Sequence, residues 1–117
     1  MDDSAAVRRS LRTLLECNSD WIVSGEAANG YDAIIKAQQL HPDLIILDMC
    51  LPIMNGLDVG RELKKQMPDV PLLMFTSADN SQLQKAALNA GFSNVTSKQD
   101  APALVASIRR LLQTPAA

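Results

Sequence analysis

Apolar residues along the chain fall into two kinds of segment that alternate. Longer stretches carry apolar side chains at helical spacing and predict helices over Ser4 to Glu16, Tyr31 to Leu40, Leu57 to Gln66, Ser81 to Ala90 and Ala103 to Leu112. Short continuous apolar runs lie between them and predict strands at Trp21 to Val23, Leu44 to Leu47, Leu72 to Phe75 and near Val95. Runs without polar alternation are typical of a parallel sheet that helices cover on both faces. The pattern therefore predicts a doubly wound α/β fold.

Residues at the segment boundaries agree with this order of elements. Asn29 and Gly30 are a turn signal before the second predicted helix, and Gly91 stands where the fourth helix would end. Pro42 and Pro71 each precede a predicted strand. The boundaries therefore separate the same helices and strands that the apolar pattern predicts.

Length and composition restrict the class of protein. The chain has 117 residues, of which 47% are hydrophobic, and this suffices for one domain with an apolar core. We expect residues 1–113 to form that domain and residues 114–117 to be its C-terminal end or the start of a linker. Cys17 and Cys50 belong to no Cys/His cluster, which excludes a structural zinc site and favours a cytoplasmic location. No run approaches the roughly 20 apolar residues of a membrane helix, and a net charge of −2 with scattered basic residues predicts no direct nucleic-acid contact.

Polar residues follow the predicted strands where an open α/β sheet binds its ligands, beyond the carboxyl ends of the strands. Asp48, Thr76 and Lys98 each follow an apolar run, and Asp2 and Asp3 precede the first helix. Carboxylates that converge on one point repel one another unless a cation lies between them, and oxygen ligands without histidine favour Mg²⁺. A lysine and a hydroxyl group beside that cation suit the oxygens of a phosphoryl group.

These residues together resemble the receiver domain of bacterial two-component response regulators. The matching motifs, whose joint spacing covers the whole chain, are Asp2-Asp3, Asp48-x-x-x-Pro52-x-x-x-Gly56, Thr76-Ser77, Lys98, Ala28-Asn29-Gly30 and Ala90-Gly91. The run Gln99-Asp100-Ala101 and the helix after it are most similar to the subclass with a helix-turn-helix output domain. The resemblance implies a flavodoxin-like fold, with the strand order 2-1-3-4-5 known for this family.

The resemblance also implies a phosphorylation site. Asp48 would be the nucleophile that takes a phosphoryl group from a sensor histidine kinase. Asp3, with Asp2 acting through water, would hold Mg²⁺ together with Asp48 and the backbone carbonyl of Cys50. The chain would catalyse only its own phosphorylation and dephosphorylation, so it would not be an enzyme acting on other substrates.

The same resemblance implies roles for two further residues, Lys98 and Thr76, and the kind of partner that the domain would regulate. Lys98 would pair with one phosphoryl oxygen, and Thr76 would hydrogen-bond another and move toward it. That movement would change the surface of the domain and thereby regulate an output domain or a homodimer. The phosphorylated protein would work in the cytoplasm, with no membrane contact.

Each of these residues also has a simpler interpretation. Asp48 is a common turn former at the end of a strand, and Asp2 and Asp3 could be an acidic terminus that interacts with a helix dipole. Lys98 could be a surface lysine, and Thr76 could be an ordinary strand-favouring residue. The joint spacing of these residues is what favours the phosphorylation site.

Three departures from the family pattern bear on function. No apolar strand stands before Asp2, which would leave the central position of the sheet empty. Unpaired backbone groups at a buried gap are costly, so we expect an apolar strand upstream of this sequence, direct pairing of the two flanking strands, or a strand from another chain, and we favour the first. Val95 stands where the family usually has an aromatic residue, and Cys50 and Ala78 stand where side chains often orient a hydrolytic water. An alternative is therefore a pseudo-receiver that binds proteins without phosphorylation. A small phosphatase or a nucleotide-binding fragment is disfavoured, because no Gly-x-Gly-x-x-Gly motif is present.

Overall fold

A computed structural model describes residues 1–17, 21–77 and 80–112 of the chain. Five helices are present in the described residues, α1 (Ala5–Glu16), α2 (Gly30–Leu40), α3 (Gly56–Gln66), α4 (Ser81–Asn89) and α5 (Ala101–Leu112). The strands in the same residues are β1 (Ile45–Leu47), β2 (Leu72–Thr76) and β3 (Asn94–Ser97). Ala78 and the expected chain end at residues 114–117 lie outside the described residues.

The helices begin and end at the residues that the boundary signals indicated. The side chain of Asn29 caps α2 by accepting a hydrogen bond from the amide of Asp32 at 2.9 Å. Asn55 and Asn80 cap α3 and α4 in the same way. Gly91, just after α4, has a φ of 101°, a backbone conformation that favours glycine. The helix boundaries predicted at Gly30 and Gly91 are therefore confirmed.

The three strands form one parallel sheet in the order β1-β2-β3. Ile46 lies opposite Leu73, and Met74 lies opposite Val95. This order matches the last three positions of the expected order 2-1-3-4-5. The predicted parallel α/β fold is confirmed, and the carboxyl ends of all three strands lie at one edge of the sheet.

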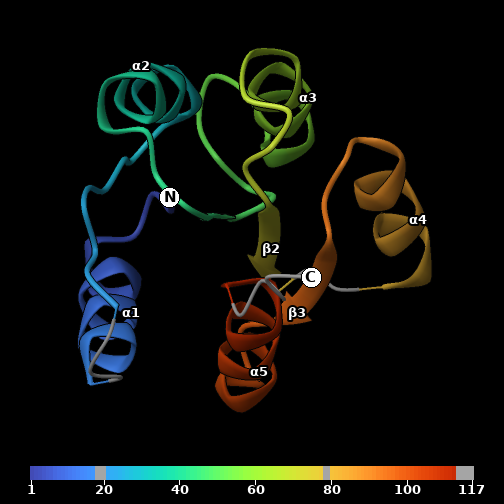
Figure 1. The fold of residues 1–117 in the computed structure, drawn as a ribbon. Coiled ribbons are helices and arrows are strands. Elements are labelled where there is room, and N and C mark those ends of the chain that lie inside the picture. The colour runs from blue at the N-terminus through green and yellow to red at the C-terminus, as the bar shows by residue number, and fades with distance from the viewer. Residues whose placement is uncertain (18–20, 78–79, 113–117) are drawn as a thin grey trace, which may run out of the picture.

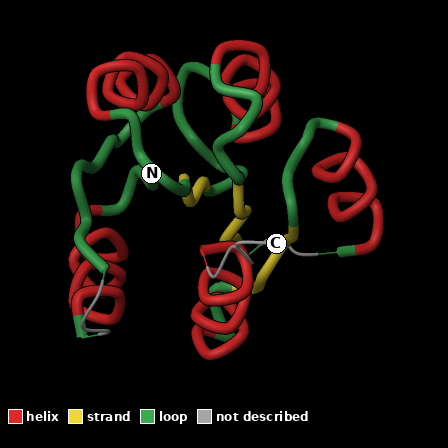
Figure 2. The backbone as a smooth tube through the Cα atoms, viewed as in Figure 1, coloured by secondary structure: helices red, strands yellow, loops and turns green. Residues whose placement is uncertain are grey.

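Helices cover both faces of this sheet, as Figures 1 and 2 show. Alternate strand residues contribute to two apolar clusters because successive side chains of a strand point to opposite faces. One cluster joins Leu47 and Met74 to helices α2, α3 and α4, and the other joins Leu73 and Phe75 to α1 and α5. No helix in the described part of the chain is both long and apolar enough to cross a membrane.

The prediction of a strand at Trp21 to Val23 is wrong. Residues 21–27 carry no strand assignment, and a cavity of about 520 Å³ lies between this segment and β1. A strand forms only beside a neighbour whose backbone it can bond, and the neighbouring position here is open. The central position is thus an open cavity, and the alternative in which the two flanking segments pair directly with each other is wrong.

Candidate phosphoacceptor site

Asp48 lies directly after β1, at the edge of the sheet where the strands end, and is 5% exposed. The amide of Cys50 donates a long hydrogen bond of 3.4 Å to the Oδ1 atom of Asp48. A carboxylate with so little access to water needs charged or polar partners. Asp48 obtains them from residues that are distant in the sequence.

Lys98 follows β3 and bridges two buried carboxylates. Its Nζ atom lies 2.8 Å from Oδ2 of Asp48 and 2.6 Å from Oδ2 of Asp2. The side chains of Asp2 and Asp48 are only 3% and 6% exposed, so these ion pairs are shielded from water. Parallel strands bring Asp48 and Lys98 together because β1 and β3 both end at this edge of the sheet.

The contacts around Asp48 shift the pKa values of both partners. Burial by itself raises the pKa of Asp48, but hydrogen bonds from Lys98 and from the Thr76 hydroxyl outweigh it, so this pKa lies below its usual value of 3.8. Burial also lowers the pKa of Lys98, and the hydrogen bonds to Asp2 and Asp48 reverse this, so that pKa lies above 10.5. Asp48 is consequently an ionised carboxylate and Lys98 a cation at neutral pH.

Thr76, the last residue of β2, is fully buried beside Asp48. Its hydroxyl donates a hydrogen bond to the Asp48 carboxylate. The strand thus presents a neutral donor on one side of Asp48, while Lys98 presents a charged donor on the other. Val95, at the position where the family usually has an aromatic residue, is a buried core residue of β3.

Three carboxylates at this edge could hold a divalent cation. Ligand oxygens of Asp2, Asp3 and Asp48 lie within 4.8 Å of one another. Asp2 is buried and already paired with Lys98, whereas Asp3 is exposed. Oxygen-only donors of this kind suit Mg²⁺, so the residues present fit that ion. Cys50, the fourth predicted ligand, is exposed in the loop after Asp48.

The loop from Asp48 to α3 depends on the absence of a side chain at Gly56. A Cβ atom built there would collide with the backbone carbonyl oxygen of Asp48 and lie 2.8 Å from the Cα atom of Met49. The Gly56 amide donates a hydrogen bond of 2.7 Å to the Met49 carbonyl, which fixes this close approach. Gly56 therefore holds the start of α3 against the loop that carries Asp48.

The structure brings together every side chain that the sequence analysis placed at this site, Asp2, Asp3, Asp48, Thr76 and Lys98. Sequence reasoning missed the contact between Asp2 and Lys98, since Lys98 was expected to face a phosphoryl oxygen. The sequence did offer a signal for this contact, because two of the acidic residues predicted at the site, Asp2 and Asp48, need a cation and Lys98 is the one lysine predicted beside them.

Sequence reasoning also missed Met1. Its α-amino nitrogen donates to the carbonyl of Ile46 at 2.7 Å, and its carbonyl accepts from the Asp48 amide at 3.0 Å. Burial lowers the pKa of this amino group from 8.0 to about 6. Met1 thus fixes the backbone of Asp48, and no side-chain motif in the sequence could have indicated a contact made by the backbone alone.

Comparison with known proteins agrees with this arrangement. A family model described as "Response regulator receiver domain" matches residues 1–109. The chain is 35% identical over 102 residues to a protein-glutamate methylesterase/protein-glutamine glutaminase of Methanosarcina acetivorans, a match covering 86% of this chain and 29% of that protein. It is 38% identical over 91 residues to the response regulator protein VraR of Staphylococcus aureus, covering 78% of this chain and 44% of VraR. The chain thus spans less than half the length of these curated relatives.

Solved structures show the same fold. A two-component response regulator of the LuxR family from an Aurantimonas species superposes with a TM-score of 0.90 at 30% identity, covering 95% of this chain and 80% of the other. The response regulator domain of Thermotoga maritima CheB superposes with a TM-score of 0.89 at 27% identity, covering 97% of this chain and 92% of the other. The chain therefore belongs to the response regulator receiver family of two-component systems.

Proposed function

We infer that this receiver domain accepts a phosphoryl group on Asp48 from a histidine kinase and changes its surface in response. The observation that carries the proposal is the position of the Lys98 ammonium, 2.8 Å from Oδ2 of a buried and ionised Asp48. Water is largely excluded there, so a positive charge stabilises a developing phosphoryl anion more strongly than it would in solvent.

In the proposed reaction, a carboxylate oxygen of Asp48 attacks the phosphorus atom of a phosphohistidine. The new O–P bond forms as the P–N bond breaks, and the histidine nitrogen leaves with the electron pair and takes up a proton. Lys98 and the Thr76 hydroxyl, which both hydrogen-bond the Asp48 carboxylate, turn to the oxygens of the transferred group. A Mg²⁺ ion held by Asp2, Asp3, Asp48 and the carbonyl of Cys50 would neutralise charge on that group.

The consequence of phosphorylation would start at Thr76. Movement of its hydroxyl toward the phosphoryl group would displace the end of β2 and the chain that leads to α4. Relatives named as LuxR-family regulators and as methylesterases suggest that the surface so changed controls an output domain, although this chain would itself catalyse only its own phosphorylation and dephosphorylation. A cytoplasmic location follows if the donor is the kinase domain of a sensor.

Incubation with acetyl phosphate and Mg²⁺, followed by intact-mass measurement, tests the proposal. One added phosphoryl group that is absent in Asp48→Asn is expected. Repeated turnover of acetyl phosphate without an adduct would instead indicate a small phosphatase.

A pseudo-receiver is the second candidate, and the cavity beside β1 is the observation that favours it. Asp48 follows β1 directly, so a strand that lacks its neighbour could hold the nucleophile too loosely for phosphoryl transfer. A folded chain that forms no adduct in the same experiment would favour this candidate.

A further inference from the structure

Arg8, near the start of α1, makes a contact with the acidic residues of the site that the proposed function does not use. Its Nη1 atom donates a hydrogen bond of 2.7 Å to the backbone carbonyl of Asp2. Its Nε atom donates to Oε1 of Glu26 at 3.2 Å, and its side chain is only 21% exposed. Side chains of a helix tilt toward its N-terminus, which lets Arg8 reach back past the cap of α1 at Ser4.

The carbonyl that Arg8 holds belongs to the peptide group between Asp2 and Asp3. A peptide group is planar, so a hydrogen bond at its oxygen also orients the amide of Asp3 and the bond from which the Asp3 side chain departs. Two more bonds hold this turn, from the amide of Asp2 to the carbonyl of Ala27 at 3.1 Å and from the amide of Ser4 to Oδ1 of Asp2 at 2.9 Å. Arg8 supplies the one side-chain donor of the set.

Asp3 is the carboxylate of the site whose position depends most on its backbone. Asp2 and Asp48 are each tied to Lys98, at 2.6 Å and 2.8 Å. The Asp3 carboxylate is exposed and has no ion pair or hydrogen bond within the described residues, yet one of its oxygens lies within 4.8 Å of ligand oxygens of Asp2 and Asp48. The orientation of the Asp2–Asp3 peptide group therefore determines whether Asp3 can share a cation with them.

Glu26 holds Arg8 in place and offsets its charge. The Glu26 carboxylate accepts from Arg8 with one oxygen and from Nε of Arg12, at 2.7 Å, with the other. An unpaired guanidinium beside the site would repel a divalent cation, and the Glu26 carboxylate reduces that repulsion. The planar fork of a guanidinium lets Arg8 bond Glu26 and Asp2 at the same time, which the single ammonium of a lysine does not do in this geometry.

We propose that Arg8 is a positioning residue for the metal site, which orients the Asp2–Asp3 peptide group so that the Asp3 carboxylate can share a cation with Asp48. The inference rests on the Mg²⁺ site of the proposed function and adds a residue that does not itself touch the metal. Removal of Arg8 also removes a positive charge, and that loss alone would strengthen the binding of a cation. A loss of Mg²⁺ affinity in an Arg8 variant therefore indicates lost positioning.

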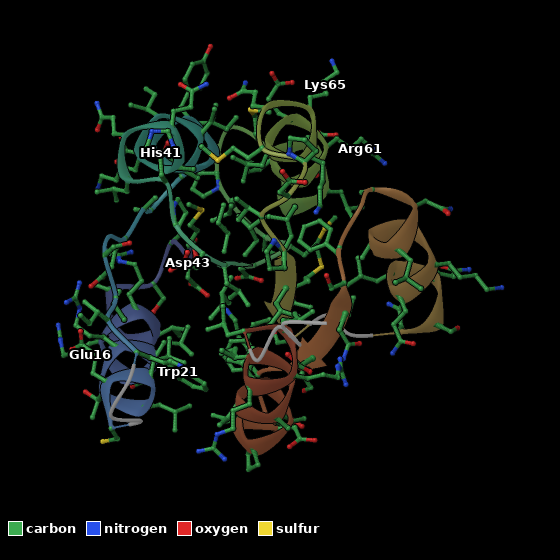
Figure 3. The ribbon with its side chains drawn as sticks, in the orientation of Figure 1. Glu16, Trp21, His41, Asp43, Arg61 and Lys65 are labelled. Atoms are coloured by element: carbon green, nitrogen blue, oxygen red, sulfur yellow. The ribbon has the colours of Figure 1, made fainter. Side chains whose placement is uncertain are left out.

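Arg12 offers a matched control on the same helix. It binds the other oxygen of Glu26 and pairs at 3.7 Å with Glu16, which Figure 3 shows at the end of α1 away from the N-terminus. In the described part of the chain Arg12 makes no hydrogen bond to Asp2. Arg8→Met and Arg12→Met thus remove the same charge and a contact with the same carboxylate, but only Arg8→Met removes the contact with Asp2.

Titration of the 117-residue chain with magnesium chloride, followed by the NMR shifts of the Asp48 and Cys50 amides, measures the affinity. Arg8→Met should raise the dissociation constant for Mg²⁺ about tenfold, as is typical when a residue that orients a metal ligand is lost. Arg12→Met should stay within about twofold of the parent chain, since its lost charge is screened at an ionic strength of about 0.15 M. Arg8→Lys keeps the charge and should still raise the constant about threefold or more, because the fork is lost.

A second readout needs no metal. Residual dipolar couplings report the direction of each N–H bond in the molecule. In Mg²⁺-free buffer, the coupling of the Asp3 amide should fit the structure in the parent chain and in Arg12→Met, and depart from it in Arg8→Met. Couplings in α2 and α3 should fit in all three proteins, which shows that the fold is intact.

Equal or tighter Mg²⁺ binding by Arg8→Met would overturn the proposal, and so would an unchanged Asp3 coupling in that variant. An equal loss of affinity in Arg8→Met and Arg12→Met would also overturn it, because the contact with Asp2 would then have no part in the effect. If Arg8→Met does not fold, Arg8→Lys decides the matter by the same two measurements. A parent chain that binds no Mg²⁺ would overturn the metal site of the proposed function together with this inference, whereas the other outcomes concern Arg8 alone.

Discussion

Lys98 places its ammonium 2.8 Å from Oδ2 of Asp48, although 50 residues separate them in the chain. The same nitrogen lies 2.6 Å from Oδ2 of Asp2. The positive charge of Lys98 therefore offsets the negative charges of two buried carboxylates. Without it, Asp2 and Asp48 would repel each other at a site with little water. The resting site is held together by the same charge that we propose to act on the phosphoryl group.

The first prediction concerns this bridge. Lys98→Met should lower the free energy of unfolding by on the order of 2 kcal/mol in Mg²⁺-free buffer, because it leaves Asp2 and Asp48 without their cation. Urea denaturation at neutral pH measures the change. Lys65→Met is the control, since the Lys65 side chain is 78% exposed. Equal stability of the two variants would contradict the bridging role.

The second prediction concerns the metal. Mg²⁺ should bind with a dissociation constant of about 1 mM, because this ion keeps several of its waters and the site offers few direct ligands. Asp3→Ala should abolish the binding, since Asp3 is the exposed carboxylate that is free of Lys98. NMR titration of the amides of Asp48 and Cys50 checks both points. An Asp3→Ala variant with an unchanged response would show that the metal lies elsewhere.

The third prediction concerns Gly56. Gly56→Ala should destabilise the chain by about 2 kcal/mol or more and disturb the loop after Asp48, because the added carbon would meet the Asp48 backbone. Gly25→Ala is the control, since its added carbon would meet only the flexible end of the Leu40 side chain. Thermal unfolding distinguishes the two. A Gly56→Ala chain that melts like the control would refute the close packing.

The fourth prediction concerns pH. A hydrogen bond from Arg12, helped by one from Arg8, holds the pKa of Glu26 below its usual value of 4.5. A carboxyl group with a lowered folded pKa contributes stability above its unfolded pKa and loses it as the pH falls through the folded value. Glu26→Gln should therefore lose less stability than the parent chain between about pH 6 and pH 3. Urea denaturation at a series of pH values measures this, and equal losses of stability in the two chains would contradict it. In an Arg12→Met background, the difference between Glu26 and Gln at this position should become smaller, because the main hydrogen bond to Glu26 is gone.

The fifth prediction concerns the cavity beside β1. Fusion of five apolar residues before Met1 should raise the melting temperature by about 5 °C or more, since the added strand would bond both walls of the cavity. A glycine and serine extension of equal length is the control. An apolar extension that leaves the melting temperature unchanged would show that the cavity does not accept a strand.

The grouping of Asp48, Thr76 and Lys98 could be predicted because it depends only on parallel strands that end at one edge of a sheet. The helices could be predicted because their apolar spacing and their asparagine caps are local signals. The strand predicted at Trp21 to Val23 was wrong because a strand needs a hydrogen-bonded neighbour, and an apolar run carries no information about that neighbour. The backbone hydrogen bonds of Met1 to Ile46 and Asp48, and of Asp2 to Ala27, could not be predicted for the same reason.

The central claim, that Asp48 is the phosphoacceptor, is tested most directly by locating the modified residue. After incubation with acetyl phosphate and Mg²⁺, borohydride reduction converts an aspartyl phosphate to homoserine, which peptide mass spectrometry assigns to a position. The account predicts this conversion at Asp48 alone, in a chain that remains folded, and none in Asp48→Asn. Conversion at another aspartate, such as Asp43 or Asp58, or none at all in the folded parent chain, would contradict it.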